Sequence, residues 1–272
     1  DMATDREPDD QQLDGKVAII SGAGAIKDGI GNGRAAAILL ARAGARIMAV
    51  DRDEELAAET ARLIEAEGGE ALAHAADVTE EAECEAMVAL AIKTFGRVDV
   101  LDNNVGIGSS GSVVDEVIEN WERVMKVNVQ TMFLTTKYAV PAMIDSGDGG
   151  AIVNVSSISA LRPRGLTAYS ASKGAVISLT RAMAMDHAAD GIRANCIAPG
   201  PVYTPMVYSR GMSDKAREQR RSASPLGIEG TGWDIGNAVV FLSSARAGYI
   251  TGQTLVVDGG VTVAAPARDP NA

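Results

Sequence analysis

The sequence predicts an α/β fold, in which a doubly wound parallel sheet of seven strands carries helices on both faces. Short apolar runs alternate with longer stretches of helical periodicity, and this alternation implies right-handed crossovers between parallel strands. Several of the runs are apolar at nearly every position, as expected for strands that are covered on both sides. No internal repeat and no linker rich in Pro, Gly or Ser divides the chain. We therefore predict one domain.

Each element can be placed by its pattern along the chain. The predicted strands are residues 16–20, 46–50, 70–76, 98–103, 151–156, 193–198 and 254–258. The predicted helices are residues 30–43, 54–67, 80–95, 118–145, 168–189 and 234–243.

The domain is expected to cover residues 13–263. An acidic, disordered segment (1–12) would precede it and a loosely ordered tail (264–272) would follow it. The connection over about 199–231 is too long for an ordinary loop. We therefore predict an active-site lid there.

Composition excludes several classes of function. A net charge of −11 disfavours binding to nucleic acid or to anionic membranes. No apolar run approaches the roughly 18 residues of a membrane span, and the polar N-terminal segment does not resemble a secretion signal. We expect a cytoplasmic protein. Cys84 and Cys196 lie far apart without histidines in metal-ligand spacing, so we expect two buried thiols and no metal site.

The run "SGAGAIKDGIGNG" (21–33) follows the first predicted strand and contains five glycines. Glycines let the backbone approach a pyrophosphate, and the following helix presents N–H groups and the positive end of its dipole. No G-x-G-x-x-G can be placed in the run. An ordinary glycine-rich turn is therefore the alternative to a cofactor loop.

Acidic residues follow the next two strands. Asp51 lies where a carboxylate can accept hydrogen bonds from an adenosine ribose, and it would repel a 2′-phosphate. We therefore predict NAD as the cofactor. NADP is the alternative, because the adjacent Arg52 could bind that phosphate. Asp77 could meet an adenine amino group, cap the next helix, or do both.

Tyr169 and Lys173, in "YSASK", are the strongest chemical signal. Their spacing places phenol and ammonium on one helix face, where the cation would lower the pKa of the tyrosine and make it a general acid/base. The same spacing also arises by chance on helix surfaces. However, Ser157 ends the strand motif "NVSS" and could present a hydroxyl to the same carbonyl. Asn128 lies in an apolar helical stretch, where a structural hydrogen bond is its alternative role.

Taken together, these motifs resemble the short-chain dehydrogenase/reductase family in its compact, single-domain form. The resemblance extends from "LDGKVAIISG" to "ITGQTLVVDGG". It includes "NNVG" (103–106), where the family usually has Asn-Asn-Ala-Gly, "KVN" ending at Asn128, "NVSS", "YSASK" and "PGPVYTPM" (199–206). It implies a Rossmann-type sheet and an NAD(P)-dependent oxidoreductase.

The resemblance implies a role for each catalytic candidate. Tyr169 would donate or accept the proton, and Ser157 would bind the substrate oxygen. Lys173 would bind the nicotinamide ribose and lower the tyrosine pKa. Asn128 would hold a water that links Lys173 to solvent. The hydride would move to or from nicotinamide C4, since the protein has no redox group of its own.

The resemblance and the strand-end positions together give a set of cofactor-binding candidates. These are Ser21, Gly22, Gly24, Gly29, Ile30, Gly31, Asp51, Arg52, Asp77, Val78, Asn104, Gly106, Tyr169, Lys173, Pro199, Gly200, Val202 and Thr204.

The expected substrate pocket is mostly apolar. Its walls are Ile107, Ser159, Leu166, Tyr203, Met206, Val207 and Tyr208. A largely hydrophobic secondary alcohol or ketone fits such walls. The family tends to form homotetramers through its fourth and fifth helices and its last strand, so we expect a homotetramer, with a dimer as the alternative.

Three features depart from the family pattern. The glycine loop is three residues longer and carries Lys27 and Asp28, and whether this insertion touches the cofactor is open. Counting back from the tyrosine favours Ser156 as the catalytic serine, whereas the strand-end motif favours Ser157. We prefer Ser157, because loop length varies more readily than strand register. Val105 replaces the usual alanine, which we read as a packing difference.

Other activities remain as alternatives. Enoyl reductases of the same superfamily also have a longer glycine loop, but their tyrosine and lysine lie seven residues apart, whereas Tyr169 and Lys173 lie four apart. An NADP-dependent carbonyl reductase is a second alternative. A dinucleotide sensor that has lost catalysis is a third, and the complete set of four catalytic candidates argues against it.

Overall fold

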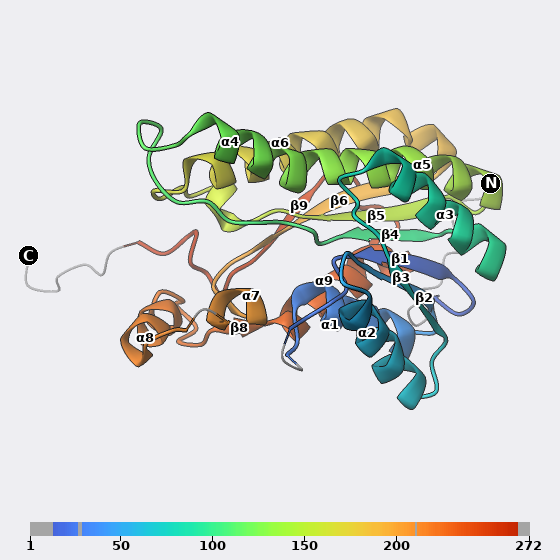
Figure 1. Ribbon diagram of the computed structural model, residues 1–272, viewed down its shortest axis with the longest axis horizontal. Coiled ribbons are helices and arrows are strands. Elements are labelled where there is room, and N and C mark those ends of the chain that lie inside the picture. Colours follow the sequence, from blue (N-terminus) through green and yellow to red (C-terminus); the bar gives the residue numbers. More distant parts are fainter. Residues whose placement is uncertain (1–12, 27–28, 210, 266–272) are drawn as a thin grey trace, which may run out of the picture.

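A single sheet of seven parallel strands forms the centre of the computed structural model, which describes residues 13–26, 29–209 and 211–265 (Figure 1). The strands lie in the order β3-β2-β1-β4-β5-β6-β9, which confirms the predicted doubly wound sheet. They are β1 (Val17–Ser21), β2 (Arg46–Asp51), β3 (Ala71–Ala75), β4 (Val100–Asn103), β5 (Gly150–Val155), β6 (Ile192–Pro199) and β9 (Thr254–Val257).

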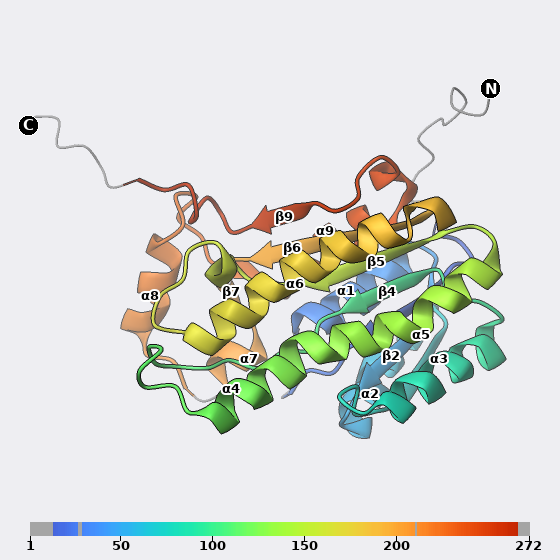
Figure 2. The ribbon, with the colours of Figure 1, turned by 90° about the horizontal axis from the view of Figure 1, so that it is seen from above.

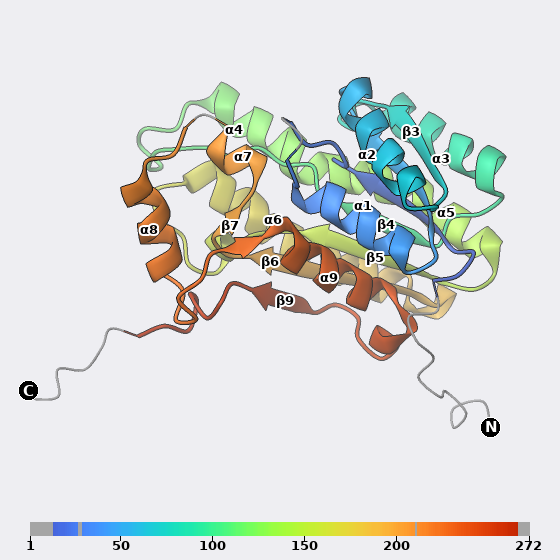
Figure 3. The same ribbon diagram turned by 90° about the horizontal axis from the view of Figure 1, so that it is seen from below.

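Helices cover both faces of the sheet (Figures 1, 2 and 3). One face carries α3 (Glu81–Phe95), α5 (Thr131–Ser146) and α6 (Thr167–Asp186). The other carries α1 (Asn32–Arg42), α2 (Glu54–Ala66) and α9 (Gly232–Ser243).

The alternation along β1 shows why the strands are apolar at every position. Val17 and Ile19 join the core formed with α3, α5 and α6, whereas Ala18 and Ile20 join the core formed with α1 and α9. Successive side chains of a strand point to opposite faces, so both sets are buried.

The predicted long helix over 118–145 is divided in the structure. It consists of α4 (Ile118–Met125), a π-helical turn (Lys126–Gln130) and α5. A π turn inserts one extra residue into a helical repeat and is often found at functional sites. Asn128 lies in this turn and is fully buried. Its side-chain hydrogen bonds, given below, hold the turn in place.

The segment predicted as a lid contains secondary structure of its own. It holds β7 (Val202–Tyr203), α7 (Pro205–Tyr208), α8 (Asp214–Ser222) and β8 (Gly230–Thr231). β7 and β8 pair with each other in a separate two-stranded sheet. Figures 2 and 3 show α7 and α8 at the end of the molecule toward which β6 and β9 point, which is the carboxyl edge of the main sheet.

The expectations for the segment 1–12, for most of the tail 264–272 and for Lys27 and Asp28 fall outside the described residues. Within the described ranges, no helix is both long enough and apolar enough to span a membrane. Cys84 and Cys196 are buried free thiols. No cluster of His, Cys, Asp or Glu suited to a metal ion occurs in that part of the chain.

Candidate active site at the carboxyl edge of the sheet

The glycine loop passes from β1 into α1 in a form that fits a dinucleotide phosphate. Gly22 has a positive φ of 74°, and a Cβ on Gly33 would overlap the carbonyl oxygen of Gly22, so the helix start packs directly on the strand exit. Gly31 caps α1 without a side-chain hydrogen bond, and the first turn has no acidic residue. The helix therefore directs uncapped N–H groups and its positive dipole end toward this edge.

Asp51, the last residue of β2, lies against the glycine loop. Its Oδ2 accepts a hydrogen bond from the Gly24 N–H at 3.0 Å and its Oδ1 accepts one from the Asp53 N–H at 3.1 Å. A Cβ on Gly24 would lie 2.6 Å from Asp51 Oδ2, so only glycine fits beside the carboxylate. Each carboxylate oxygen keeps a further lone pair for a ribose hydroxyl. Arg52 is exposed.

Asp77 does not cap α3, which corrects one of its two predicted roles. The N-cap residue of α3 is Glu80. Asp77 Oδ1 instead accepts a hydrogen bond from the Thr79 N–H at 3.0 Å, and this bond lowers the pKa of the carboxyl below its usual value. Asp77 is exposed and the neighbouring Val78 is buried. The position of Asp77 after β3 leaves it open to a ligand.

The end of β4 joins the same edge. The Asn104 N–H donates to the Ser21 carbonyl at 3.1 Å, and its side-chain Nδ2 donates to Asp102 Oδ2 at 2.5 Å. Asp102 is fully buried, and burial raises the pKa of its carboxyl to about 8. Its Oδ1 has no hydrogen-bond partner among the described residues. The protonated acid is therefore the favoured form at neutral pH.

Ser157, Tyr169 and Lys173 converge next to this strand end. The Ser157 hydroxyl accepts a hydrogen bond from the Ser159 N–H at 3.1 Å and is itself hydrogen-bonded to the Tyr169 phenol. Lys173 is 3% exposed, and its Nζ donates to the Val155 carbonyl at 2.8 Å. A Cβ on Gly106 would lie 3.1 Å from that Nζ. The hydroxyl, the phenol and the ammonium thus border one site.

The expected lowering of the Tyr169 pKa by Lys173 is not found in the structure. Burial raises the pKa of Tyr169 above its usual value, and the bond from Ser157 opposes this only in part. The Lys173 Nζ lies 5.8 Å from the ring centroid and turns toward Val155. Burial also lowers the pKa of Lys173 to about 8. Each group is therefore displaced toward its neutral form.

Asn128 ties the loop after β4 to α6. Its Nδ2 donates to the Ile107 carbonyl and to Ser172 Oγ, both at 2.9 Å, and its Oδ1 accepts from the Ile107 N–H at 2.7 Å. The Ser172 hydroxyl in turn donates to the Tyr169 carbonyl at 2.7 Å. Both N–H bonds of the amide are thus used within the protein. The structural role considered from the sequence is present, and the role in holding a water stays a prediction.

The two serines of "NVSS" differ in what they face. The Ser156 hydroxyl donates to the Lys173 carbonyl at 2.7 Å and is 3% exposed, so it joins β5 to α6. The Ser157 hydroxyl faces Tyr169. The geometry therefore favours the strand-end motif over the residue count.

The segment predicted as a lid meets the main sheet close to the glycine loop. Val202 and Thr204 are each 7% exposed, and a Cβ on Gly200 would lie 2.5 Å from Asp258 Cβ. The rings of Tyr203 and Tyr208 pack 4.7 Å apart. Met206 is 67% exposed. Predicted pocket walls thus come both from the lid and from the loops around Tyr169, where Ile107 is bonded to Asn128 and Ser159 to Ser157.

Some supporting residues were missed by the sequence reasoning. Arg34 is fully buried, although it follows a glycine run that suggests only a helix start. Ser109 Oγ accepts a hydrogen bond from the Tyr169 N–H at 2.9 Å. Asp102 interrupts an apolar strand. Arg34 and Asp102 could have been found in the sequence, because each is a charged residue within an apolar or small-residue pattern. No local pattern in the sequence marks Ser109.

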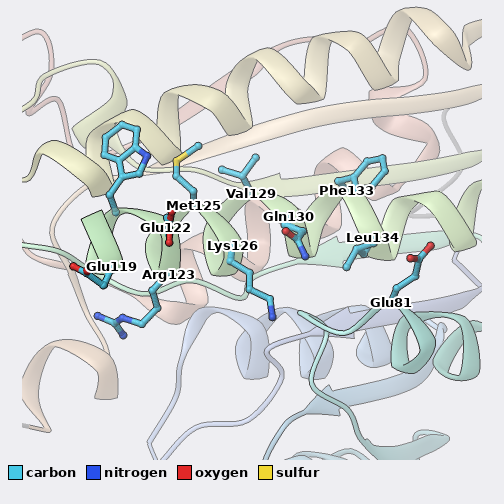
Figure 4. Close-up of a pocket in the computed structure, with 11 residues that line it drawn as sticks. Glu81, Glu119, Glu122, Arg123, Met125, Lys126, Val129, Gln130, Phe133 and Leu134 are labelled. Atoms are coloured by element: carbon cyan, nitrogen blue, oxygen red, sulfur yellow. The ribbon is translucent and has the colours of Figure 1, made fainter. Parts of the chain in front are cut away.

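An open groove of about 990 Å³ lies away from this site (Figure 4). It runs along the outer side of α4, the π turn and α5, and Glu81 of α3 closes one end. Apolar and charged side chains line it together, among them Trp121, Phe133, Glu122 and Lys126. None of its lining residues belongs to the predicted catalytic, cofactor or substrate set.

Comparisons with known proteins cover most of the chain. Residues 24–262 match the family model described as Enoyl-(Acyl carrier protein) reductase. The chain is 38% identical to 2-(S)-hydroxypropyl-CoM dehydrogenase 3 of Xanthobacter autotrophicus, over 92% of this chain and 98% of the relative. It is 37% identical to 2,5-dichloro-2,5-cyclohexadiene-1,4-diol dehydrogenase of Sphingobium indicum, over 93% and 98%. A crystal structure from Burkholderia xenovorans, assigned to the short-chain dehydrogenases/reductases, superposes with a TM-score of 0.87 at 40% identity, over 93% and 98% of the two chains.

Proposed function

This chain belongs to the short-chain dehydrogenase/reductase family and is an oxidoreductase that acts on CH–OH groups with NAD(P), and we propose that it interconverts a largely hydrophobic secondary alcohol and its ketone with NAD. The observation that carries the proposal is the convergence of Ser157, Tyr169 and Lys173 beside the end of β4, which is itself bonded to Ser21 at the start of the glycine loop. Two relatives named above also act on molecules that carry an alcohol group, by their names.

The residues at the carboxyl edge fit the dinucleotide. The uncapped start of α1 would hold the phosphates, and Asp51 would accept hydrogen bonds from the adenosine ribose. Bound NAD supplies the hydride acceptor of alcohol oxidation at nicotinamide C4. The preference for NAD follows from Asp51, because a carboxylate beside the loop repels a 2′-phosphate.

Proton transfer is the task of Tyr169. A raised pKa keeps its phenol protonated at neutral pH, which suits a general acid for the substrate oxygen in ketone reduction. Ser157 accepts from Ser159, and its own O–H, which meets the Tyr169 phenol in this structure, would donate to the same substrate oxygen. In alcohol oxidation the phenolate form of Tyr169 would accept the hydroxyl proton, while the hydride would leave the carbon by a separate route, to the bound NAD.

Lys173 supports that transfer in the oxidative direction. Its lowered pKa, about 8, leaves the side chain largely protonated at neutral pH. A buried cation near the phenol would favour the phenolate once the substrate and the dinucleotide close the site. Asn128 would position both groups, since it holds Ile107 on one side and Ser172 on the other.

The decisive test is Tyr169→Phe, which removes the acid and keeps the ring. NADH binding, followed by quenching of protein fluorescence, should be retained. Turnover on a panel of secondary alcohols with NAD should fall by a factor of about 10²–10⁴. Normal turnover by this variant would exclude the mechanism. A wild type that binds NADH but is silent across a broad panel would instead favour the dinucleotide sensor.

Cofactor choice has its own experiment. Wild type should use NAD in preference to NADP, and Asp51→Ala should lose that preference. Arg52→Ala is the matched control. It should keep the preference for NAD, because the exposed arginine would assist only NADP. Equal use of both cofactors by wild type would exclude the argument from Asp51 and favour the NADP-dependent carbonyl reductase.

The description of the matching family model favours one second candidate, an enoyl thioester reductase. Against it stands the spacing of four residues between Tyr169 and Lys173 on α6. NADH oxidation with an enoyl thioester, measured beside NADH oxidation with a cyclic ketone, separates the two. Activity on the thioester alone would replace the proposal.

We also propose that the groove of Figure 4 is covered by a second copy of the chain in a homotetramer, with a dimer as the alternative. The groove holds acidic and basic side chains on one face, Glu119 and Glu122 beside Arg123 and Lys126, so a two-fold axis can pair them. Phe133 is 50% exposed there. Light scattering should show that wild type is an assembly of several chains. Phe133→Glu, which places a negative charge in the groove, should give a smaller particle.

A further inference from the structure

The enlarged glycine loop touches the lid directly. A Cβ on Gly29 would overlap Pro205 Cγ and the Tyr208 hydroxyl, both in α7. A Cβ on Gly232, where α9 begins after β8, would lie 2.9 Å from the Gly31 carbonyl oxygen and 3.0 Å from that of Ile30. At Gly29 the loop backbone therefore meets the side chains of Pro205 and Tyr208 directly, and at Ile30 and Gly31 it lies against Gly232, just past the lid.

The other side of the loop is held by a buried arginine. Arg34 is fully buried, and its guanidinium donates to the Gly29 carbonyl at 2.9 Å, to Thr60 Oγ1 at 2.9 Å and to the Leu56 carbonyl at 3.3 Å. The Thr60 hydroxyl donates to the Ala23 carbonyl at 2.9 Å. Arg34 and Thr60 of α2 thus hold the loop at two backbone carbonyls, those of Gly29 and Ala23.

The lid is also braced internally, so it can move as a unit. Arg220 pairs with Glu229 and donates to the Val202 carbonyl at 2.9 Å. The guanidinium of Arg217 lies 4.1 Å from the ring centroid of Tyr203. These contacts join α8, β7 and the residues before β8. The ring of Tyr208 in α7 packs on that of Tyr203 in β7, so a displacement at α7 would be carried to the rest of the lid.

We propose that Gly29 couples dinucleotide binding to the position of the substrate lid, and that Arg34 is the positioning residue that holds Gly29 against α7. The proposal rests on the proposed function, since it needs a dinucleotide in the loop and a substrate under the lid. Because Gly29 has no side chain of its own, α7 packs directly on the loop backbone, and a close-packed contact transmits small shifts instead of absorbing them.

The coupling must be reciprocal. If the dinucleotide favours one lid position, a ligand under the lid must favour dinucleotide binding by the same factor. Typical couplings of this kind are about 5- to 150-fold. The sequence left open whether the insertion touches the cofactor, and the described part of the loop contacts the lid.

The test is amide hydrogen exchange of α7 and α8 in the full chain, with and without saturating NADH. In wild type, NADH should slow exchange of these amides by about fivefold or more. Gly29→Ala should bind NADH at saturation without that slowing, because its methyl group displaces α7. Gly174→Ala is the control, because it adds the same group in α6, outside the predicted cofactor set, where a Cβ would meet no atom within 4 Å. Its lid amides should respond as in wild type.

Arg34→Lys provides a second variant, which keeps the charge and loses the planar fork. It should weaken the NADH effect on the lid. Failure of wild type to bind NADH would count against the proposed function. NADH binding with an unchanged lid in wild type, or with equal slowing in Gly29→Ala, would overturn this inference and leave the proposed function standing.

Discussion

Asp102 gives the sharpest prediction, because a single buried carboxyl should control how stability depends on pH. It lies in β4 between Ile20 of β1 and Val153 of β5. Burial raises its pKa from 3.8 to about 8, and only the hydrogen bond from Asn104 opposes this shift. Asp102→Asn keeps an acceptor for Asn104 and removes the ionisable group.

The sign and size of the effect follow from the two pKa values. Between about pH 4 and pH 8 the folded protein holds a proton on Asp102 that the unfolded chain has released. The unfolded state therefore binds fewer protons, and the free energy of unfolding falls as pH rises, by about 1.4 kcal/mol per pH unit. Relative to Asp102→Asn, wild type should lose about 3 kcal/mol between pH 5 and pH 7.

Urea unfolding of both proteins at pH 5, 6 and 7, at one protein concentration, measures this difference. Asp148→Asn is the control. Arg97 lowers the pKa of Asp148, so this carboxyl is ionised in both states across the range and its removal should not change the slope. Parallel pH profiles for wild type and Asp102→Asn would refute the reasoning. If unfolding proves irreversible, infrared spectroscopy replaces urea unfolding as the measurement. The carbonyl band of a protonated carboxyl should be present in wild type and absent in Asp102→Asn.

Three further outcomes are expected from the site. Ser157→Ala should retain NADH binding and lose about 10²-fold or more in kcat, whereas Ser156→Ala should cost about 1 kcal/mol of stability from its lost bond to α6; urea unfolding and steady-state kinetics separate them. Gly33→Ala should abolish NADH binding in a fluorescence titration, because its Cβ overlaps the strand exit, while Gly174→Ala, with nothing within 4 Å, should not. Lys173→Met should remove a rise in stability above pH 8, since the lowered pKa makes the folded state bind fewer protons than the unfolded chain there. If the urea midpoints of wild type and variant changed by the same amount as the pH rises above 8, this prediction would be contradicted.

The sequence alone was sufficient to predict the sheet and to name the edge at which we propose that ligands bind. Apolar runs at nearly every strand position predicted a sheet covered on both faces, and β1 confirms this with side chains in both cores. The carboxyl ends of parallel strands meet at one edge, so residues after four different strands could be assigned to one site without a structure. Asp51, Asn104 and Ser157 were placed in this way.

Local patterns could not decide which neighbour a side chain meets. Counting residues favoured Ser156 and the strand motif favoured Ser157, and only the packing of β5 on α6 shows that Ser156 is bonded to the Lys173 carbonyl. The spacing of Tyr169 and Lys173 predicted a lowered tyrosine pKa. In the structure burial outweighs the cation, because the ammonium turns to the Val155 carbonyl.

The sequence alone is enough to predict the periodicity of the elements, the strand ends that carry polar groups and a loop suited to a dinucleotide. These properties depend on residues near one another along the chain. The tertiary structure decided the π turn at Asn128, the burial of Arg34 and of Asp102, and the contact of Gly29 with the lid. Each of these depends on segments far apart in sequence, where desolvation and packing set the energy and no local pattern records the partner.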